Sequence, residues 1–256
     1  MTVPAHHLVE LGERAAEQFA ALPAFGTRTA DGFTWLSYAA WGEAVAACRA
    51  GLAALGIGPG DRVCIVANNR VEWAVVAYAT YGRGAALVPM YEAQRPEEWR
   101  YILGDSGARV AVVSRPEIAA ALREQQSDLA ALEHVLTIEA SAADTSSYAA
   151  LLARGRASPV AALHPVVGDV AGVIYTSGTT GRPKGVLLTH GNFCTNVASI
   201  HEIFSIDRDT TLSFLPWAHV FGQTADLHSM LAGGVAIALN DAIPNLIDNL
   251  ALVRPT

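Results

Sequence analysis

Apolar residues recur at helical spacing along residues 38–55, and they fall on one face of a predicted helix. That face carries Tyr38, Trp41, Val45, Cys48, Leu52 and Leu55. A turn rich in glycine and proline follows at residues 56–60, and the apolar run 63–67 is short enough to be a strand buried on both faces. We expect Asn68 or Asn69 to cap the next helix, which extends to about Gly82.

Short apolar runs and helical patterns continue to alternate after this point. The runs 85–89, 109–114 and 134–138 are predicted strands. One helix begins at Pro96 and is expected to end at Gly104, and another covers residues 116–126. Strands that alternate with helices at this spacing predict an α/β fold, with mostly parallel sheets flanked by helices and right-handed crossovers.

The pattern weakens between residues 140 and 168 and then resumes. Predicted strands cover 170–175, 185–189, 212–215 and 235–239, and predicted helices begin near Asn192 and cover 221–231 and 244–253. We therefore predict a first α/β subdomain at residues 1–165 and the start of a second at 166–256, with the boundary somewhere within 140–168. The strands 170–175 and 212–215 are expected to share one sheet.

Composition narrows the classes of partner. The net charge of −7, the pI near 5.6 and the scattered basic residues argue against binding to nucleic acid, which would need a basic surface. Cys48, Cys64 and Cys194 each lie in an apolar stretch and are predicted to be buried free thiols. Without a signal peptide or a run of ~18 apolar residues, we expect a cytoplasmic protein with no membrane span.

The segment 175–185, with the sequence Tyr-Thr-Ser-Gly-Thr-Thr-Gly-Arg-Pro-Lys-Gly, concentrates groups that suit phosphate. Its glycines permit close approach of the backbone to a ligand, and its N–H and hydroxyl donors can surround phosphate oxygens. The predicted nucleotide-binding residues are Thr176, Ser177, Gly178, Thr179, Thr180, Gly181, Lys184 and Gly185. A plain surface turn is the alternative, but four Ser and Thr hydroxyls, three glycines and a lysine between two apolar strands disfavour it.

The P-loop of NTPases is a second alternative, and the residues around Lys184 disfavour it. That motif requires glycine before the lysine and serine or threonine after it, whereas this chain has Pro183 and Gly185. In addition, residues 186–188 have the apolar pattern of a strand, where the P-loop is followed by a helix.

Residues 175–185, together with Thr189-His190-Gly191-Asn192, resemble the phosphate-binding signature of the adenylate-forming superfamily, which includes acyl-CoA synthetases, adenylation domains of peptide synthetases and luciferases. Residues 88–91, 96–106 and 215–222 resemble further segments of that superfamily. Within it, the chain is most similar to long-chain fatty acyl-CoA synthetases, and the resemblance covers almost its whole length.

The resemblance implies a two-step reaction that uses ATP, Mg²⁺ and coenzyme A. A carboxylic acid, expected to be a medium- or long-chain fatty acid, is first converted to acyl-AMP and then to acyl-CoA. Lys184 and the glycine-rich segment would hold the β- and γ-phosphates and offset the charge on the leaving pyrophosphate. Two alternatives stay open: an adenylating enzyme that loads a carrier protein, and a shortened nucleotide-binding protein without catalysis.

His219 is the second candidate catalytic residue. A lone histidine among apolar neighbours is usually a core residue, but the resemblance implies that His219 lies beside the bound carboxylate and adenylate. It also implies that Phe221 and Gly222 help to form the acyl pocket. The other histidines have no metal-ligand spacing, so we predict no metal site made by these side chains.

Several elements that the resemblance implies have no counterpart in residues 1–256. They are a glutamate that helps to hold magnesium, an aspartate that binds the ribose, and a mobile carboxy-terminal domain with a reactive lysine. We therefore expect the chain to be part of a longer ligase, and we expect the chain by itself to bind ATP weakly without turning it over.

Overall fold

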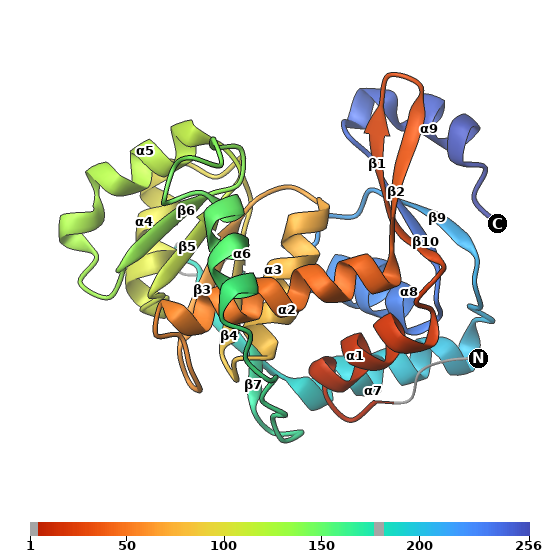
Figure 1. Cartoon of the computed structure of the whole chain (residues 1–256), viewed down its shortest axis with the longest axis horizontal. Coiled ribbons are helices and arrows are strands. Elements are labelled where there is room, and N and C mark those ends of the chain that lie inside the picture. The colour runs from red at the N-terminus through yellow and green to blue at the C-terminus, as the bar shows by residue number, and fades with distance from the viewer. Residues whose placement is uncertain (1–4, 177–181) are drawn as a thin grey trace.

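The computed structural model describes residues 5–176 and 182–256, which form two sheets with helices between and around them (Figure 1). The larger sheet has six strands in the order β6-β5-β3-β4-β7-β8. Its strands are β3 (Arg62–Val66), β4 (Ala86–Met90), β5 (Val110–Val113), β6 (His134–Thr137), β7 (Val170–Thr176) and β8 (Lys184–Thr189). All neighbours pair in parallel except β7 and β8, which are antiparallel. The predicted α/β fold with mostly parallel sheets is confirmed.

Strand β3 is buried on both faces, as its apolar sequence predicts. Val63 and Ile65 point into one core, which also contains helices α2 (Tyr38–Ala54), α3 (Val71–Tyr81) and α6 (Tyr148–Ala157). Cys64 and Val66 point into a second core, which is covered by α4 (Pro96–Ser106) and α5 (Pro116–Glu124). Side chains alternate across a strand, so this sheet needs helices on both faces.

The smaller sheet has four strands in the order β2-β1-β10-β9. They are β1 (Pro23–Thr29), β2 (Gly32–Ser37), β9 (Thr210–Ser213) and β10 (Ala236–Leu239). β1 pairs in parallel with β10, from the far end of the chain. Each sheet thus takes strands from both sides of residues 140–168, and the subdomain division stays a prediction. The expectation that 170–175 and 212–215 share a sheet is wrong, because β7 and β9 belong to different sheets.

The remaining helices are α1 (Leu8–Gln18), α7 (His190–Ile203), the π-helix η2 (Gly222–His228), α8 (Ser229–Ala232) and α9 (Leu246–Val253), with 3₁₀ turns at η1 (Gln126–Asp128) and η3 (Ile243–Asn245). Helix α1 and strands β1 and β2 were not predicted from the sequence, and two further details differ from the predictions. Helix α4 continues past Gly104 and ends at Ser106, and it is followed by Gly107, whose φ of 61° fits a left-handed C-cap. Helix α6 lies within the weakly patterned stretch, where no helix was expected.

Cys48, Cys64 and Cys194 are buried and free, as predicted. Burial raises the pKa of each thiol above its ordinary value, because a thiolate would be poorly solvated there. No helix in the described parts of the chain is both long and apolar enough to cross a bilayer.

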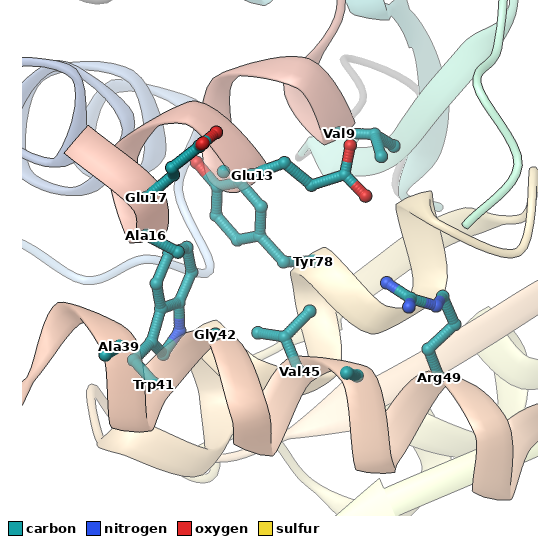
Figure 2. Close-up of a pocket in the computed structure, with 12 residues that line it drawn as sticks. Val9, Glu13, Ala16, Glu17, Ala39, Trp41, Gly42, Val45, Arg49 and Tyr78 are labelled. Carbon is teal, nitrogen blue, oxygen red and sulfur yellow. The ribbon is translucent and has the colours of Figure 1, made fainter. Parts of the chain in front are cut away.

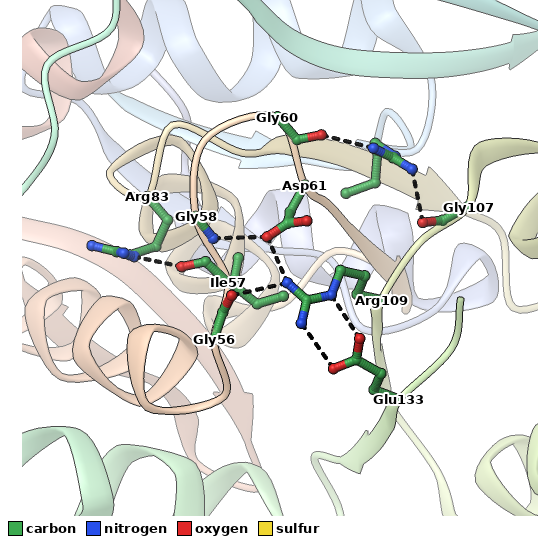
Figure 3. A network of polar contacts seen from close by, with 10 residues as sticks. Gly56, Ile57, Gly58, Gly60, Asp61, Arg83, Gly107, Arg109 and Glu133 are labelled. Atoms are coloured by element: carbon green, nitrogen blue, oxygen red, sulfur yellow. Dashed lines mark hydrogen bonds and ion pairs between the residues drawn. The ribbon is translucent and has the colours of Figure 1, made fainter. Parts of the chain in front are cut away.

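An arginine network holds together the turns at the amino ends of β3, β5 and β6 (Figure 3). Arg109 Nη1 donates to Gly56 O at 2.9 Å and to Asp61 Oδ2 at 2.8 Å. Arg109 Nε and Nη2 also make a two-pronged contact with Glu133, at 2.8 and 2.9 Å. These hydrogen bonds hold the pKa of Glu133 below its usual value. The network lies at the edge of the sheet opposite to the carboxyl ends of the parallel strands. We therefore infer that it stabilises the fold and is not part of a ligand site.

Two histidines are buried in the core beside α3. His228 Nδ1 is 2.9 Å from Tyr78 Oη, and the Nδ1 of His190 accepts the N–H of Leu8 at 3.3 Å. Burial lowers the pKa of His228 to about 3 and that of His190 to about 4. Both rings therefore stay neutral in the folded protein at pH values where an unfolded histidine is protonated.

This difference predicts acid sensitivity. Between pH 6.5 and about 4 the unfolded chain binds more protons than the native chain at these sites, so stability falls as pH falls. Replacing His228 by Asn should flatten this dependence by up to about 1.4 kcal/mol per pH unit in that window. The free energy of unfolding, measured in urea at several pH values, tests this. His6→Asn, at an exposed position, is the control; parallel pH profiles for wild type and His228→Asn would contradict the prediction.

Candidate functional site

Asn69 joins the two sheets at their carboxyl ends. It lies just after β3, and its side-chain Nδ2 donates to Ser213 Oγ at 3.1 Å and to Leu215 O at 2.8 Å. Its Oδ1 accepts the N–H of Trp217 at 2.8 Å. The prediction that Asn68 or Asn69 caps the next helix is wrong: the N-cap is Arg70, and Asn69 instead fixes the backbone of the segment that leads to His219.

The phosphate-binding segment begins at the same edge of the larger sheet. Strands β3, β4 and β7 are parallel neighbours. Asn69, which follows β3, and Thr176, which ends β7, therefore lie at the same edge of the sheet. Neighbouring strands are ~4.8 Å apart, which puts the ends of β3 and β7 roughly 10 Å from one another. Ligands in open α/β sheets bind outside the carboxyl ends of the strands, where this edge lies.

A cavity of about 370 Å³ is open at the carboxyl ends of both sheets. It is lined by residues that follow β3, β4, β9 and β10, among them Asn69, Tyr91, Phe214, Pro216 and Asn240. Its wall therefore contains residues of the segment that carries His219. This is the volume of a small-ligand pocket and lies where the topology predicts one.

Strands β7 and β8 bring the two ends of the phosphate-binding segment together. Thr176 and Lys184 are paired across these antiparallel strands, and both are exposed. Gly185 lies opposite Tyr175, and a Cβ added there would come within 3.2 Å of the Tyr175 ring and 2.9 Å of Val173. Ser177, Gly178, Thr179, Thr180 and Gly181 lie outside the described residues, so their assignment to nucleotide binding stays a prediction from sequence.

His219 is exposed, and its ring orientation is fixed by the backbone. The N–H of Phe221 donates to His219 Nδ1 at 3.2 Å. In the neutral ring Nδ1 is therefore the acceptor, and the proton is on Nε2. An exposed imidazole with a free Nε2–H donor is not a core histidine, and it can hydrogen-bond to a carboxylate.

The two residues after His219 differ in their environment. Phe221 is 59% exposed, so its ring is available to contact an apolar ligand. Gly222 is buried, and a Cβ at this position would lie only 2.2 Å from the carbonyl oxygen of Pro216. Glycine at 222 is thus required by close backbone packing, whatever else it contacts.

Asp226 lies below this segment in the π-helix η2. Ser213 Oγ donates to Asp226 Oδ2 at 2.5 Å, and Ser213 also accepts from Asn69. Burial raises the pKa of Asp226 to about 6, although the Ser213 hydrogen bond acts in the opposite direction. A polar chain therefore runs from β3 through Asn69 and Ser213 to Asp226.

Within residues 5–176 and 182–256, no three His, Cys, Asp or Glu side chains are arranged to hold a metal ion.

A further cavity of about 330 Å³ lies between α1, α2 and α3 (Figure 2). Trp41 and Tyr78 contribute aromatic surface to it, while Glu13, Glu17 and Arg49 bring charge to its walls. None of the predicted site residues that the structure describes lines this cavity, and it lies among helices rather than at the strand ends. We therefore place the candidate site at the sheet edge.

The family model of AMP-binding enzymes matches residues 12–254. The chain belongs to this family. The resemblance found in the sequence is confirmed by this match and by the relatives described next, which include long-chain acyl-CoA ligases.

Long chain acyl-CoA synthetase 6, peroxisomal, from Arabidopsis thaliana is 31% identical over 261 residues, which cover 95% of this chain and 37% of the relative. The long-chain-fatty-acid–CoA ligase FadD15 of Mycobacterium tuberculosis is 34% identical over 220 residues, which cover 83% of this chain and 36% of the relative. The inhibitor-bound N-terminal domain of FACL13 from M. tuberculosis is 26% identical with a TM-score of 0.81, covering 98% of this chain and 60% of that structure. The chain thus spans somewhat more than a third of these curated relatives.

Sequence reasoning identified Lys184 but missed the role of Asn69. Lys184 is the only lysine in the chain; the other 16 of the 17 basic residues are arginines. Composition alone therefore distinguishes Lys184, before any motif is considered. Asn69 carries no such signal, because its partners lie more than 140 residues away.

Asn69→Ala should destabilise the protein. It removes three hydrogen bonds and leaves Leu215 O and the Trp217 N–H without this partner, so we expect a loss of about 2–4 kcal/mol in the free energy of unfolding. Urea unfolding followed by tryptophan fluorescence measures it. Asn68→Ala, at the exposed neighbouring position, should change stability by less than ~0.5 kcal/mol. Equal effects of the two substitutions would show that Asn69 does not join the sheets.

Proposed function

We propose that the protein takes part in ATP-dependent activation of a carboxylic acid, with medium- or long-chain fatty acids as substrates and coenzyme A as the acceptor. The residues of this chain supply the phosphate-binding segment and the histidine segment of such a ligase. Because the chain spans only about 37% of the Arabidopsis relative, the complete activity is proposed for an enzyme of full family length, and ATP binding is proposed for this chain.

One observation carries the proposal. The only lysine of a chain that matches the AMP-binding family lies at the start of β8, exposed and opposite Thr176 at the carboxyl end of β7. An ammonium at the edge where a parallel sheet binds ligands is suited to phosphate oxygens. The fatty-acid part of the proposal is supported by the roughly 30% identity to long-chain acyl-CoA ligases.

The chemical step assigns distinct tasks to the two segments. A carboxylate oxygen attacks the α-phosphorus of ATP, the new O–P bond forms, and the bond to the β-phosphate breaks as pyrophosphate leaves. In this proposal Lys184 offsets the negative charge that grows on the leaving pyrophosphate. His219 donates its Nε2–H to the carboxylate and orients the attacking oxygen, with Phe221 beside the acyl chain. The thiol of coenzyme A then displaces AMP and gives the thioester.

Lys184→Ala should weaken binding of ATP to this chain at least tenfold, because the substitution removes its only ammonium side chain. Isothermal titration calorimetry with ATP measures the change. In a full-length homologue, the equivalent substitution should slow acid-dependent ATP–pyrophosphate exchange roughly thirtyfold to a thousandfold. Lys184→Arg, which keeps the charge, and Arg208→Ala, in an exposed turn, are the controls. An exchange rate within threefold of wild type would contradict the role of Lys184.

His219→Ala should lower exchange with fatty acids by on the order of a hundredfold in such a homologue, with an unchanged melting temperature because the side chain is exposed. His164→Ala, at another exposed histidine, is the matched control. The same assay, run with acetate, amino acids and fatty acids of increasing length, tests the substrate class, and the acceptor follows from supplying coenzyme A or a carrier protein. Turnover of acetate or an amino acid, with all fatty acids inert, would overturn the fatty-acid proposal.

A further inference from the structure

Helix α4 contacts both ends of the phosphate-binding segment. Tyr101 Oη donates to Pro183 O at 3.0 Å, one residue before Lys184. One turn later on the same helix, Asp105 Oδ2 accepts the hydroxyl of Tyr175 at 2.6 Å, one residue before Thr176. Residues four apart lie on the same face of a helix, so one face of α4 reaches both strands.

Aromatic and cation–π contacts reinforce these two hydrogen bonds. The guanidinium of Arg182 lies over the Tyr101 ring, 5.8 Å from its centroid. The rings of Tyr101 and Tyr175 meet edge to face, with centroids 6.5 Å apart and planes at 85°. Arg182, Pro183 and Tyr175 are thus each held to α4 by at least one specific contact.

Most of the attachment of α4 to the sheet comes from Trp99, Ile102 and Leu103, which are buried in the core beneath the helix. Tyr101 is partly buried and its side chain packs against this core, whereas Asp105 is exposed. Substitutions at Asp105, and Tyr101→Phe, which keeps the ring, therefore separate the contacts to the segment from the packing of the helix.

We propose that Tyr101 and Asp105 are positioning residues that hold Lys184 and Thr176 in the geometry needed to bind the phosphates of ATP. This rests on the proposed function. Lys184 follows the anchored Pro183 directly, and its ladder partner Thr176 follows the anchored Tyr175. An error of ~1 Å in placing a reacting group can cost about a hundredfold in rate, so an anchor at each end of the segment matters for catalysis.

The single lysine gives a direct measurement. A lysine-specific endoproteinase can cut this chain only after Lys184, so the rate of that one cleavage reports how firmly the start of β8 is held. Tyr101→Ala and Asp105→Ala should each accelerate cleavage at least fivefold and weaken pyrophosphate binding, measured by calorimetry, at least fivefold. Tyr101→Phe, which keeps the ring but loses the hydrogen bond to Pro183, should fall between wild type and Tyr101→Ala. Asp105→Asn, which keeps an acceptor for Tyr175, should restore both values to within twofold of wild type.

Arg100→Gln is the matched control, because Arg100 lies on the same helix but pairs with Asp128 at 2.8 Å. Its cleavage rate and pyrophosphate affinity should equal those of wild type. Alanine variants at 101 and 105 that cleave and bind pyrophosphate within twofold of wild type would overturn the proposal, as would failure of Asp105→Asn to restore binding. Absence of pyrophosphate binding by the wild type would instead overturn the proposed function, and the cleavage rates would still decide whether α4 holds Lys184.

Discussion

The burial of β3 on both faces is the constraint on which the rest of this structure depends. Its side chains enter two cores in alternation, so helices must cover each face, and its neighbours β4 and β5 run parallel to it. Parallel strands send their carboxyl ends to one edge. Asn69, the turn after β4 and the end of β7 consequently meet at the same place, and the smaller sheet is attached there through hydrogen bonds to the backbone that precedes His219.

This arrangement separates stability from chemistry within one sheet. At the amino ends of the strands, Arg109 donates to Asp61, to Glu133 and to a backbone carbonyl. At the carboxyl ends, by contrast, Lys184 and His219 are exposed. A buried polar chain through Ser213 and Asp226 supports the histidine segment from below without reaching its imidazole. The charged residues that stabilise the sheet thus lie at the opposite edge from Lys184 and His219, which are proposed to contact the substrates.

Local patterns were sufficient to predict most strands of the larger sheet, because each buried strand is a continuous apolar run. They failed where structure depends on distant partners. β1 was not predicted, since its place is decided by pairing with β10, and α6 lacks a strong pattern because it packs on α2 through small residues such as Gly51 and Gly155. At the candidate site, the motif around Lys184 was readable from residue types and spacing. The roles of Asn69, Tyr101 and Asp105 were not, because each acts through hydrogen bonds to residues at least 70 positions away.

The π-helix η2 has a consequence for how this part of the chain can vary. Its wide turns let Asp226 face Ser213 of β9 while His228, two residues on, faces Tyr78 of α3. Such turns arise in helices as single extra residues, often at functional sites. Deleting one residue between Phe221 and Ser229 would let an ordinary α-helix form and would rotate one of the two side chains away from its partner. This stretch should therefore tolerate exchanges of residue type more readily than changes of length, and related chains should keep its residue count even where their sequences diverge.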